Sequence, residues 1–313
     1  MPSVRGFRFA KLLGVVLLLT VLTLAGCGGG GSGTGGTSKP GTGISLTIGS
    51  KNDPDGQLLA WMYSLLLTNQ GFTVTTKTAL GQTPVLDAAI KSGAVDIYPE
   101  FTGTGIGVYK LPSSQDAQTL YNTVKGYYES NFKITWLDPA YNLNDSYGLC
   151  TTQAIANQYN LKKMSDLVPV AGQLTLGGQQ DFTDPQQGVF PPVATAYGLK
   201  FKKTVNITEQ LSFGAVQKGD IQINECYTTD PAIVVNNFVL LQDDKSAFPL
   251  YNPAPIVRDS TLAKSSAIAS TLNPLETHLT TESQTALIKQ VAIDHQKPED
   301  VAKAFLKAQG LLP

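Results

Sequence analysis

The sequence predicts an α/β fold, and three observations favour it. Apolar residues make up 42% of the 313 residues and are spread along the chain, which excludes disorder for most of it. From residue 44 onward, short β-branched runs alternate with segments of helical periodicity. One helix–strand unit also occurs twice, at a constant spacing of 126 residues. The length suits one large domain or two of about 150 residues.

Glycine and proline mark the boundaries of the expected elements. The first strand alternates apolar and polar residues and stops at Gly49, and a leucine-rich helix follows it and ends near Gly71. Pro84 suits the first turn of the next helix, which Gly93 ends. Strands are expected near residues 44–48, 72–78, 95–98, 134–137, 147–151, 174–176, 204–207, 221–224, 238–242 and 254–257, and helices near 58–66, 84–90, 282–293 and 299–309.

The repeated unit places two aromatic residues at equivalent positions. Residues 89–102 align without gaps on residues 215–228, and each copy has a helix end, a glycine, a short strand, and then an aromatic residue and a threonine just past the strand. The aromatic residues are Phe101 and Tyr227. Ligands of open α/β sheets bind beyond the carboxyl ends of the strands. We therefore expect both rings to face a shared cleft. The alternative is that any two βα units resemble each other in this way and that both aromatic residues belong to the core.

Composition and motifs argue against several functional classes. The 23 basic and 24 acidic residues nearly balance, so no nucleic-acid partner is expected. Two histidines and three cysteines make a zinc cage or an iron–sulfur cluster improbable, and we expect no metal and no cofactor. The chain has no G-x-S-x-G, H-E-x-x-H or P-loop motif, so it is not expected to be an enzyme. An enzyme that uses carboxylates such as Glu100 and Glu225 is a weaker alternative.

The N-terminal residues have the pattern of an export signal. Arg5, Arg8 and Lys11 precede an uncharged apolar run over residues 12–25, which predicts a signal peptide over residues 1–26. The sequence L-A-G-C that ends at Cys27 resembles the lipobox of bacterial lipoproteins, which implies that Cys27 is diacylated and becomes the mature N-terminus. Residues 27–43 then comprise this cysteine and a flexible glycine-rich linker. The expected location is extracytoplasmic, on the outer face of the cell membrane; an ordinary cleavage site with an incidental cysteine is the alternative.

Several segments together resemble one known family. They are I-G-S-K-N (48–52), A-A-I-K-S-G-A-V-D-I-Y-P-E-F-T-G-T (88–104), N-D-S-Y-G-L (144–149), Y-T-T-D (227–230), F-P-L-Y (248–251) and A-P-I-V-R (254–258). Over residues 44–310 the chain resembles the osmoprotectant-binding proteins of ABC importers, which take up glycine betaine, choline, carnitine and related quaternary amines. The resemblance implies a solute receptor that delivers its ligand to an ABC permease in the membrane, and we expect it to be a monomer.

The resemblance also implies a bilobal periplasmic-binding-protein fold (type II), with two α/β lobes joined by two hinge crossings. Lobe 1 would comprise residues 44–146 and 249–313, and lobe 2 residues 147–248. The ligand would be enclosed when the lobes close by a hinge motion.

An aromatic cage is carried over by this resemblance onto Phe101, Tyr147, Tyr227 and Tyr251. A trimethylammonium group cannot donate a hydrogen bond, but it is positive and apolar, and aromatic faces attract it. The family usually has a tyrosine at the position of Phe101. Phenylalanine keeps the ring face but lacks the phenolic hydroxyl. Asp145 is expected to add a carbonyl or carboxylate oxygen near the cation. For each aromatic residue, a place in the core stays the alternative.

A ligand that carries a carboxylate needs a second, positive pole. The resemblance carries this role onto Lys51 and Thr104. The arginine that the family supplies from lobe 2 is missing, because residues 181–190 contain no basic residue. A buried carboxylate without its full set of partners is costly. Choline, whose hydroxyl is neutral, is therefore expected to bind better than glycine betaine.

Cys150 and Cys226 remain once Cys27 is lipidated. Export permits a disulfide, and both cysteines are expected on strands of lobe 2 beside Tyr147 and Tyr227. A disulfide between them and two separate buried thiols are both open.

The leading hypothesis is thus a lipid-anchored receptor for choline or glycine betaine. A binding protein of the same architecture for another small solute, such as an amino acid, is one alternative. A sensor lipoprotein that is not coupled to transport is another.

Overall fold

The structure is a computed structural model that describes residues 38–186 and 188–313. The expected signal peptide, Cys27 and most of the glycine-rich linker lie outside the described residues. Among the helices of the described ranges, none has the length and apolar character needed to span a bilayer.

Strands and helices alternate along the chain, as expected for an α/β fold. The strands are β1 (Ser45–Lys51), β2 (Thr73–Gly81), β3 (Ile97–Phe101), β4 (Ile134–Trp136), β5 (Tyr147–Thr152), β6 (Thr175–Gly178), β7 (Lys203–Asn206), β8 (Ile223–Tyr227), β9 (Phe238–Leu241) and β10 (Pro253–Arg258). The α-helices are α1 (Pro54–Asn69), α2 (Thr83–Ser92), α3 (Thr102–Tyr109), α4 (Ala117–Phe132), α5 (Gln153–Tyr159), α6 (Gln180–Thr183), α7 (Phe190–Tyr197), α8 (Glu209–Lys218), α9 (Pro231–Val235), α10 (Asp259–Leu262), α11 (Ala267–Glu276), α12 (Thr281–Ala292) and α13 (Pro298–Ala308).

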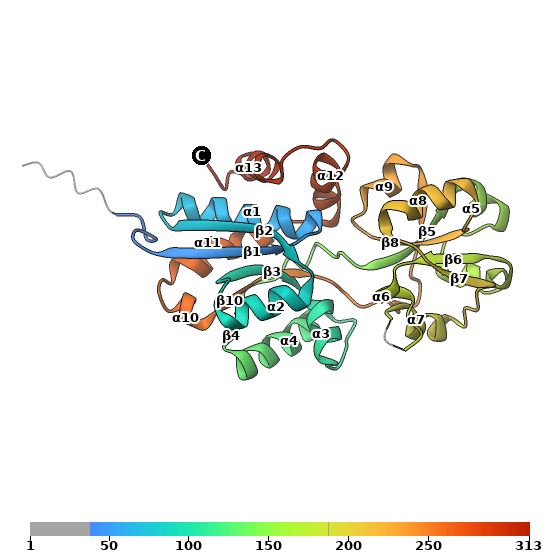
Figure 1. Ribbon diagram of the computed structural model, residues 1–313, viewed down its shortest axis with the longest axis horizontal. Coiled ribbons are helices and arrows are strands. Elements are labelled where there is room, and N and C mark those ends of the chain that lie inside the picture. The colour runs from blue at the N-terminus through green and yellow to red at the C-terminus, as the bar shows by residue number, and fades with distance from the viewer. Residues whose placement is uncertain (1–37, 187) are drawn as a thin grey trace, which may run out of the picture. The chain divides into compact units, whose positions relative to one another are not determined.

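The first lobe is built on a sheet with the strand order β2-β1-β3-β10-β4. β1 is parallel to β2 and β3, and β10 runs antiparallel to β3 and β4. Figure 1 shows α1 on one side of this sheet and α2 and α4 on the other. Each side has its own core, because successive strand residues point to opposite faces: Ile97 packs with the residues of α1, and Tyr98 packs with those of α2 and α4.

The second lobe is built on a sheet with the order β7-β6-β8-β5-β9. β6 is parallel to β7 and β8, whereas β5 is antiparallel to β8 and β9. α8 covers one face and α7 the other (Figure 1), and each face again has a separate core. Two α/β lobes of this topology make up the type II periplasmic-binding-protein fold.

Two crossings, over residues 137–146 and 242–252, connect the lobes. Hydrogen bonds tie these crossings to each other. The Ser146 hydroxyl donates to the Pro249 carbonyl at 2.7 Å, and the Tyr251 amide donates to Asn144 Oδ1 at 2.8 Å. The Ser146 amide donates to the Thr228 hydroxyl at 3.0 Å, so the end of β8 is anchored to the same junction.

The repeated unit has the same structure in both lobes. α2 and β3 correspond to α8 and β8 at the constant spacing of 126 residues, and the glycine after each helix, Gly93 or Gly219, has a positive φ of 84° or 83°. The expected strand ends were wrong in one respect. Phe101 and Tyr227 are the last residues of their strands rather than residues beyond them, because Phe101 still pairs with Pro253 and Tyr227 with Tyr147.

Candidate functional site

Tyr147 and Tyr227 form an aromatic pair at one end of the second sheet. They stand directly opposite each other on the antiparallel strands β5 and β8, so their side chains project from the same face. Their ring centroids are 4.9 Å apart at an interplanar angle of 40°. Tyr251, from the second crossing, meets the Tyr147 ring edge-on at 5.5 Å. The structure therefore brings three of the four expected cage residues together.

Tyr251 is held in place through its backbone and its ring. Its amide donates to Asn144, and its carbonyl accepts a hydrogen bond from the Asp145 amide at 3.0 Å. The ring lies directly on the backbone of Gly103 in α3, since a Cβ atom on that glycine would sit 2.8 Å from two ring carbons. Only glycine leaves room for this approach.

Phenylalanine rings extend the tyrosine group into the core of the second lobe. Phe182 stacks on Tyr147 at 5.4 Å, and Phe248 lies 6.1 Å from Phe182. Sequence reasoning missed Phe182, although it lies in the segment over residues 181–190 where the family arginine is missing. An aromatic residue in a segment expected to line the cleft was the available signal.

Phe101 lies in the first lobe at the end of β3 and is 5% exposed. The Lys51 ammonium is 5.4 Å from the centre of its ring. Tyr251 packs against the same apolar cluster that contains Phe101. Phe101 and Tyr251 thus pack in the same apolar cluster, and the role of Phe101 in the cage stays a prediction.

Lys51 forms a buried ion pair with Glu100 inside the first lobe. Its Nζ lies 2.5 Å from Glu100 Oε1, and the two side chains are 8% and 0% exposed. Glu100 also accepts hydrogen bonds from the Phe101 amide at 2.8 Å and the Tyr98 hydroxyl at 3.1 Å. Burial, and then the Glu100 charge, hold the pKa of Tyr98 well above its usual value, which keeps this hydroxyl a donor. The expected role of Lys51 toward a ligand carboxylate stays a prediction.

Thr104 and Asp145 are the remaining predicted polar residues, and Asp230 lies close to Asp145's partner Thr229 in sequence. Thr104 is half-buried in the first turn of α3. Asp145 accepts a hydrogen bond from the Thr229 hydroxyl. Asp230 caps α9 by accepting from the Ala232 amide at 2.8 Å, and burial raises its pKa to about 6.

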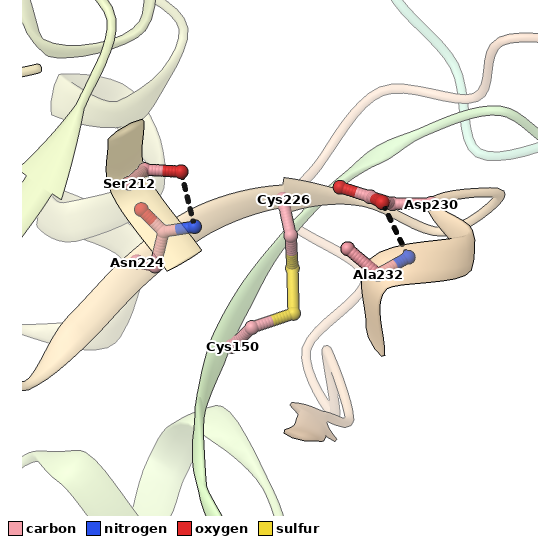
Figure 2. The surroundings of a disulfide bond; sticks show 6 residues. All are labelled: Cys150, Ser212, Asn224, Cys226, Asp230 and Ala232. Carbon is pink, nitrogen blue, oxygen red and sulfur yellow. Dashed lines mark hydrogen bonds between the residues drawn. A yellow bond between two sulfur atoms is a disulfide. The ribbon is translucent and has the colours of Figure 1, made fainter. Parts of the chain in front are cut away.

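Cys150 and Cys226 are joined in a disulfide whose Cα atoms are 6.0 Å apart (Figure 2). Cys150 pairs with Asn224 and Cys226 with Gly148 across β5 and β8. Because side chains alternate along a strand, the disulfide lies on the opposite face from the tyrosine pair. It therefore joins the two strands that carry Tyr147 and Tyr227.

A small cavity, about the size of a water molecule, lies at the carboxyl edge of β6 and β8. It is lined by Gly178, Gln179, Ser212, Asn224, Glu225 and Tyr227 among others. The Gln179 amide donates to Glu225 Oε2 at 2.5 Å. Across the described ranges, no group of three or more histidine, cysteine or acidic side chains could hold a metal ion.

Comparisons with known proteins agree with this architecture. Residues 44–308 match the model of a family described as the substrate binding domain of ABC-type glycine betaine transport systems. A glycine-betaine-binding protein of Pseudomonas aeruginosa is 31% identical over 86% of this chain and 89% of its own length. The glycine betaine-binding protein YehZ of Escherichia coli is 29% identical over 84% and 90%. The crystal structure of a glycine betaine/carnitine/choline ABC transporter protein matches 85% of this chain and 99% of its own with a TM-score of 0.75 at 22% identity.

Proposed function

Because the chain belongs to the family of substrate-binding domains of ABC-type glycine betaine transport systems, we propose that it captures a quaternary ammonium osmoprotectant outside the cytoplasm and delivers it to a membrane permease. The relatives named above bind glycine betaine according to their names. Proteins of this family are solute-binding receptors, and we assign this chain the same non-enzymatic role.

The main support for the proposal is the contact of the Tyr147 ring with the rings of Tyr227 and Tyr251. A quaternary ammonium group is recognised through ring faces, because it has no N–H to donate and its charge is attracted by the π-electrons. Each face contributes about 0.5–2 kcal/mol, with the higher value for a desolvated face, so three faces supply about 1.5–6 kcal/mol of the binding free energy. Ring contacts at 4.9 and 5.5 Å pre-organise the tyrosines, which lowers the entropy lost on binding.

Calorimetry with choline and glycine betaine tests this function. Each substitution Tyr147→Leu, Tyr227→Leu and Tyr251→Leu keeps apolar bulk but removes a ring face, and it should weaken binding by about 1–2 kcal/mol, roughly 5- to 30-fold. Tyr159→Leu is the control, because Tyr159 packs against the core of the second lobe from α5. Wild-type protein that binds neither ligand at millimolar concentration would reject the proposal.

Phe101 is included in the proposed cage as the contribution of the first lobe. Phe101→Leu should then weaken binding about as much as the tyrosine substitutions, and Phe101→Tyr should keep or improve it. A Phe101→Leu variant that binds both ligands like the wild type would assign this ring to the core alone.

We further propose that a lipid on Cys27 anchors the receptor to the outer face of the membrane. The support is the basic and apolar leader before the L-A-G-C sequence and the glycine-rich linker after it. In the native host, the protein should be labelled by palmitate and partition into detergent, and Cys27→Ser should abolish both. Unlabelled wild-type protein in the aqueous phase would contradict the anchor.

A further inference from the structure

Thr102 and Thr228 occupy equivalent positions of the repeated unit, 126 residues apart. Thr102 directly follows Phe101, the last residue of β3, and Thr228 directly follows Tyr227, the last residue of β8. Thr102 is fully buried, and Thr228 is half-buried. Neither threonine belongs to the proposed cage, although each is the neighbour of a cage residue.

Thr228 binds the first crossing through three hydrogen bonds. Its hydroxyl donates to the Asn144 carbonyl at 2.6 Å and accepts from the Ser146 amide at 3.0 Å. Its own amide donates to the Ser146 carbonyl at 2.9 Å, which continues the pairing of β8 with β5 by one residue beyond Tyr227 and Tyr147. The first crossing is thus fastened to the second lobe at the point where it enters β5.

Thr102 binds the second crossing in the same way. Its hydroxyl donates to the Leu250 carbonyl at 3.2 Å and accepts from the Asn252 amide at 3.1 Å. Its own amide donates to the Asn252 carbonyl at 3.0 Å, which continues the pairing of β3 with β10. Because the same three bonds recur in both lobes at the repeat spacing, they are a feature of the repeated unit rather than an incidental contact of one loop.

The two crossings are also bonded to each other. We call residues 143–146 and 249–252 the hinge centre. The Asn252 side-chain amide donates to the Leu143 carbonyl at 2.8 Å, in addition to the bonds between the crossings described above. The hinge centre is therefore one hydrogen-bonded unit, and each lobe holds it through one threonine.

We propose that Thr102 and Thr228 are paired positioning residues, whose hydroxyls fasten the hinge centre to the two lobes and set the pivots about which the lobes close on a ligand. Loss of either hydroxyl leaves a backbone carbonyl and a backbone amide without their partners, so the hinge centre can turn relative to the lobe. Closure on a ligand must then order the hinge as well, which lowers the affinity. The pivots do not depend on which solute binds, so this inference goes beyond the proposed function.

The first test needs no ligand. Distances between the lobes are measured on the frozen full mature chain by electron spin resonance, with spin labels on non-natural amino acids at the exposed positions Lys77 and Lys202. Thr102→Val and Thr228→Val keep the side-chain shape but remove the hydroxyl, and each should widen the distance distribution. Thr102→Ser and Thr228→Ser keep the hydroxyl and should give the wild-type distribution.

Thr151→Val is the matched control. Thr151 is buried in β5, and its hydroxyl donates to the Gln222 carbonyl at 2.7 Å inside the second lobe. Its loss removes a hydrogen bond of the same kind, so it should lower stability but leave the distances between the lobes unchanged. A purely structural role of Thr102 and Thr228 predicts that their valine variants behave like this control, and that result would overturn the proposal.

Hydrogen exchange of the wild type tests the same bonds without a variant. The Ser146 and Asn252 amides each donate to a threonine hydroxyl, so both should exchange at least about 100-fold more slowly than in an unstructured chain. Unprotected amides at both positions would also overturn the proposal, even if a valine variant does not fold.

Calorimetry separates this inference from the proposed function. Choline or glycine betaine, whichever the wild type binds more tightly, should bind about 5- to 10-fold more weakly to Thr102→Val and Thr228→Val, and within about twofold of wild type to Thr151→Val. Folded valine variants with wild-type affinity would overturn the role of the hydroxyls in closure. Wild type that binds neither compound would reject the proposed function, whereas the distances between the lobes would still decide the role of the two threonines.

Discussion

Lys51 and Glu100 form a buried ion pair between the adjacent parallel strands β1 and β3, with Nζ 2.5 Å from Oε1. The same carboxylate accepts from the Phe101 amide, so the pair also fixes the backbone at the end of β3. Two motif residues of the sequence, the lysine of G-S-K and the glutamate of Y-P-E-F, are therefore partners of each other.

Lys51→Ala should destabilise the protein by about 3–5 kcal/mol, because Glu100 would be left as a buried charge without its cation. Denaturant unfolding measures this loss. Lys264→Ala is the control: its ion pair with Asp96 is 3.9 Å long and partly exposed, and its loss should cost less than about 1 kcal/mol. A Lys51→Ala protein of wild-type stability that loses only glycine betaine binding would instead place the lysine against the ligand.

Gly103→Ala should weaken ligand binding about 10-fold or more, since the added methyl group would displace the Tyr251 ring and the Leu250 carbonyl. Gly107→Ala on the same helix meets no atom within 4 Å. It should bind like the wild type and gain up to about 1 kcal/mol of stability from helix propensity. Calorimetry and thermal unfolding of the pair separate the two effects, and equal binding by both variants would refute the close approach.

The Cys150–Cys226 disulfide closes a loop with a sequence separation of 76 residues. Replacing both cysteines by alanine should lower the free energy of unfolding by about 2–4 kcal/mol, because the unfolded chain gains conformational freedom. The free energy of ligand binding should change less than the free energy of unfolding, since strand pairing still positions Tyr147 and Tyr227. Addition of a reductant should lower the melting temperature of the wild type but not of the double variant; a wild type insensitive to reductant in partial denaturant would contradict the stabilising role.

Asp230 makes stability depend on pH in a definite direction. Burial raises its pKa to about 6 in the folded state from an ordinary value of 3.8, so between these values the folded protein holds more protons than the unfolded chain. The contribution of this carboxyl therefore becomes more favourable as pH falls from about 6 to about 4. Asp230→Asn keeps a capping acceptor for the Ala232 amide and should be more stable than wild type by roughly 1–2 kcal/mol at pH 7, with the difference vanishing near pH 4. Unfolding curves at both pH values provide the measurement, and a pH-independent difference would exclude the titration of Asp230.

Local signals predicted much of the fold. Every expected strand overlaps an observed one. Gly93 ends α2, as expected, and adopts the left-handed conformation that favours glycine. The helices α3 to α7 and α9 to α11 were not expected from the sequence. α3 contains three glycines, which have poor helix propensity, and is stabilised by tertiary packing against Tyr251.

The candidate site was predictable only through the family resemblance. The pairing of Tyr147 with Tyr227 depends on the register of β5 and β8, which no local pattern specifies. Lys51 was expected to face a ligand, but its pairing with Glu100 depends on the neighbouring strand. The adjacency of Glu225 and Phe182 arises from a crossover in the second sheet, where β6 and β8 are neighbours although β7 lies between them in sequence.

The proposed function requires that this protein recognise a positive quaternary nitrogen through aromatic faces. The most direct measurement compares choline with 3,3-dimethyl-1-butanol, in which a neutral carbon replaces the nitrogen and the shape is almost unchanged. Calorimetry should show choline binding at least about 100-fold more tightly, because only the cation is attracted by the tyrosine faces. Equal affinity for the two compounds, or no binding of either choline or glycine betaine at millimolar concentration, would contradict recognition of the cation by aromatic faces.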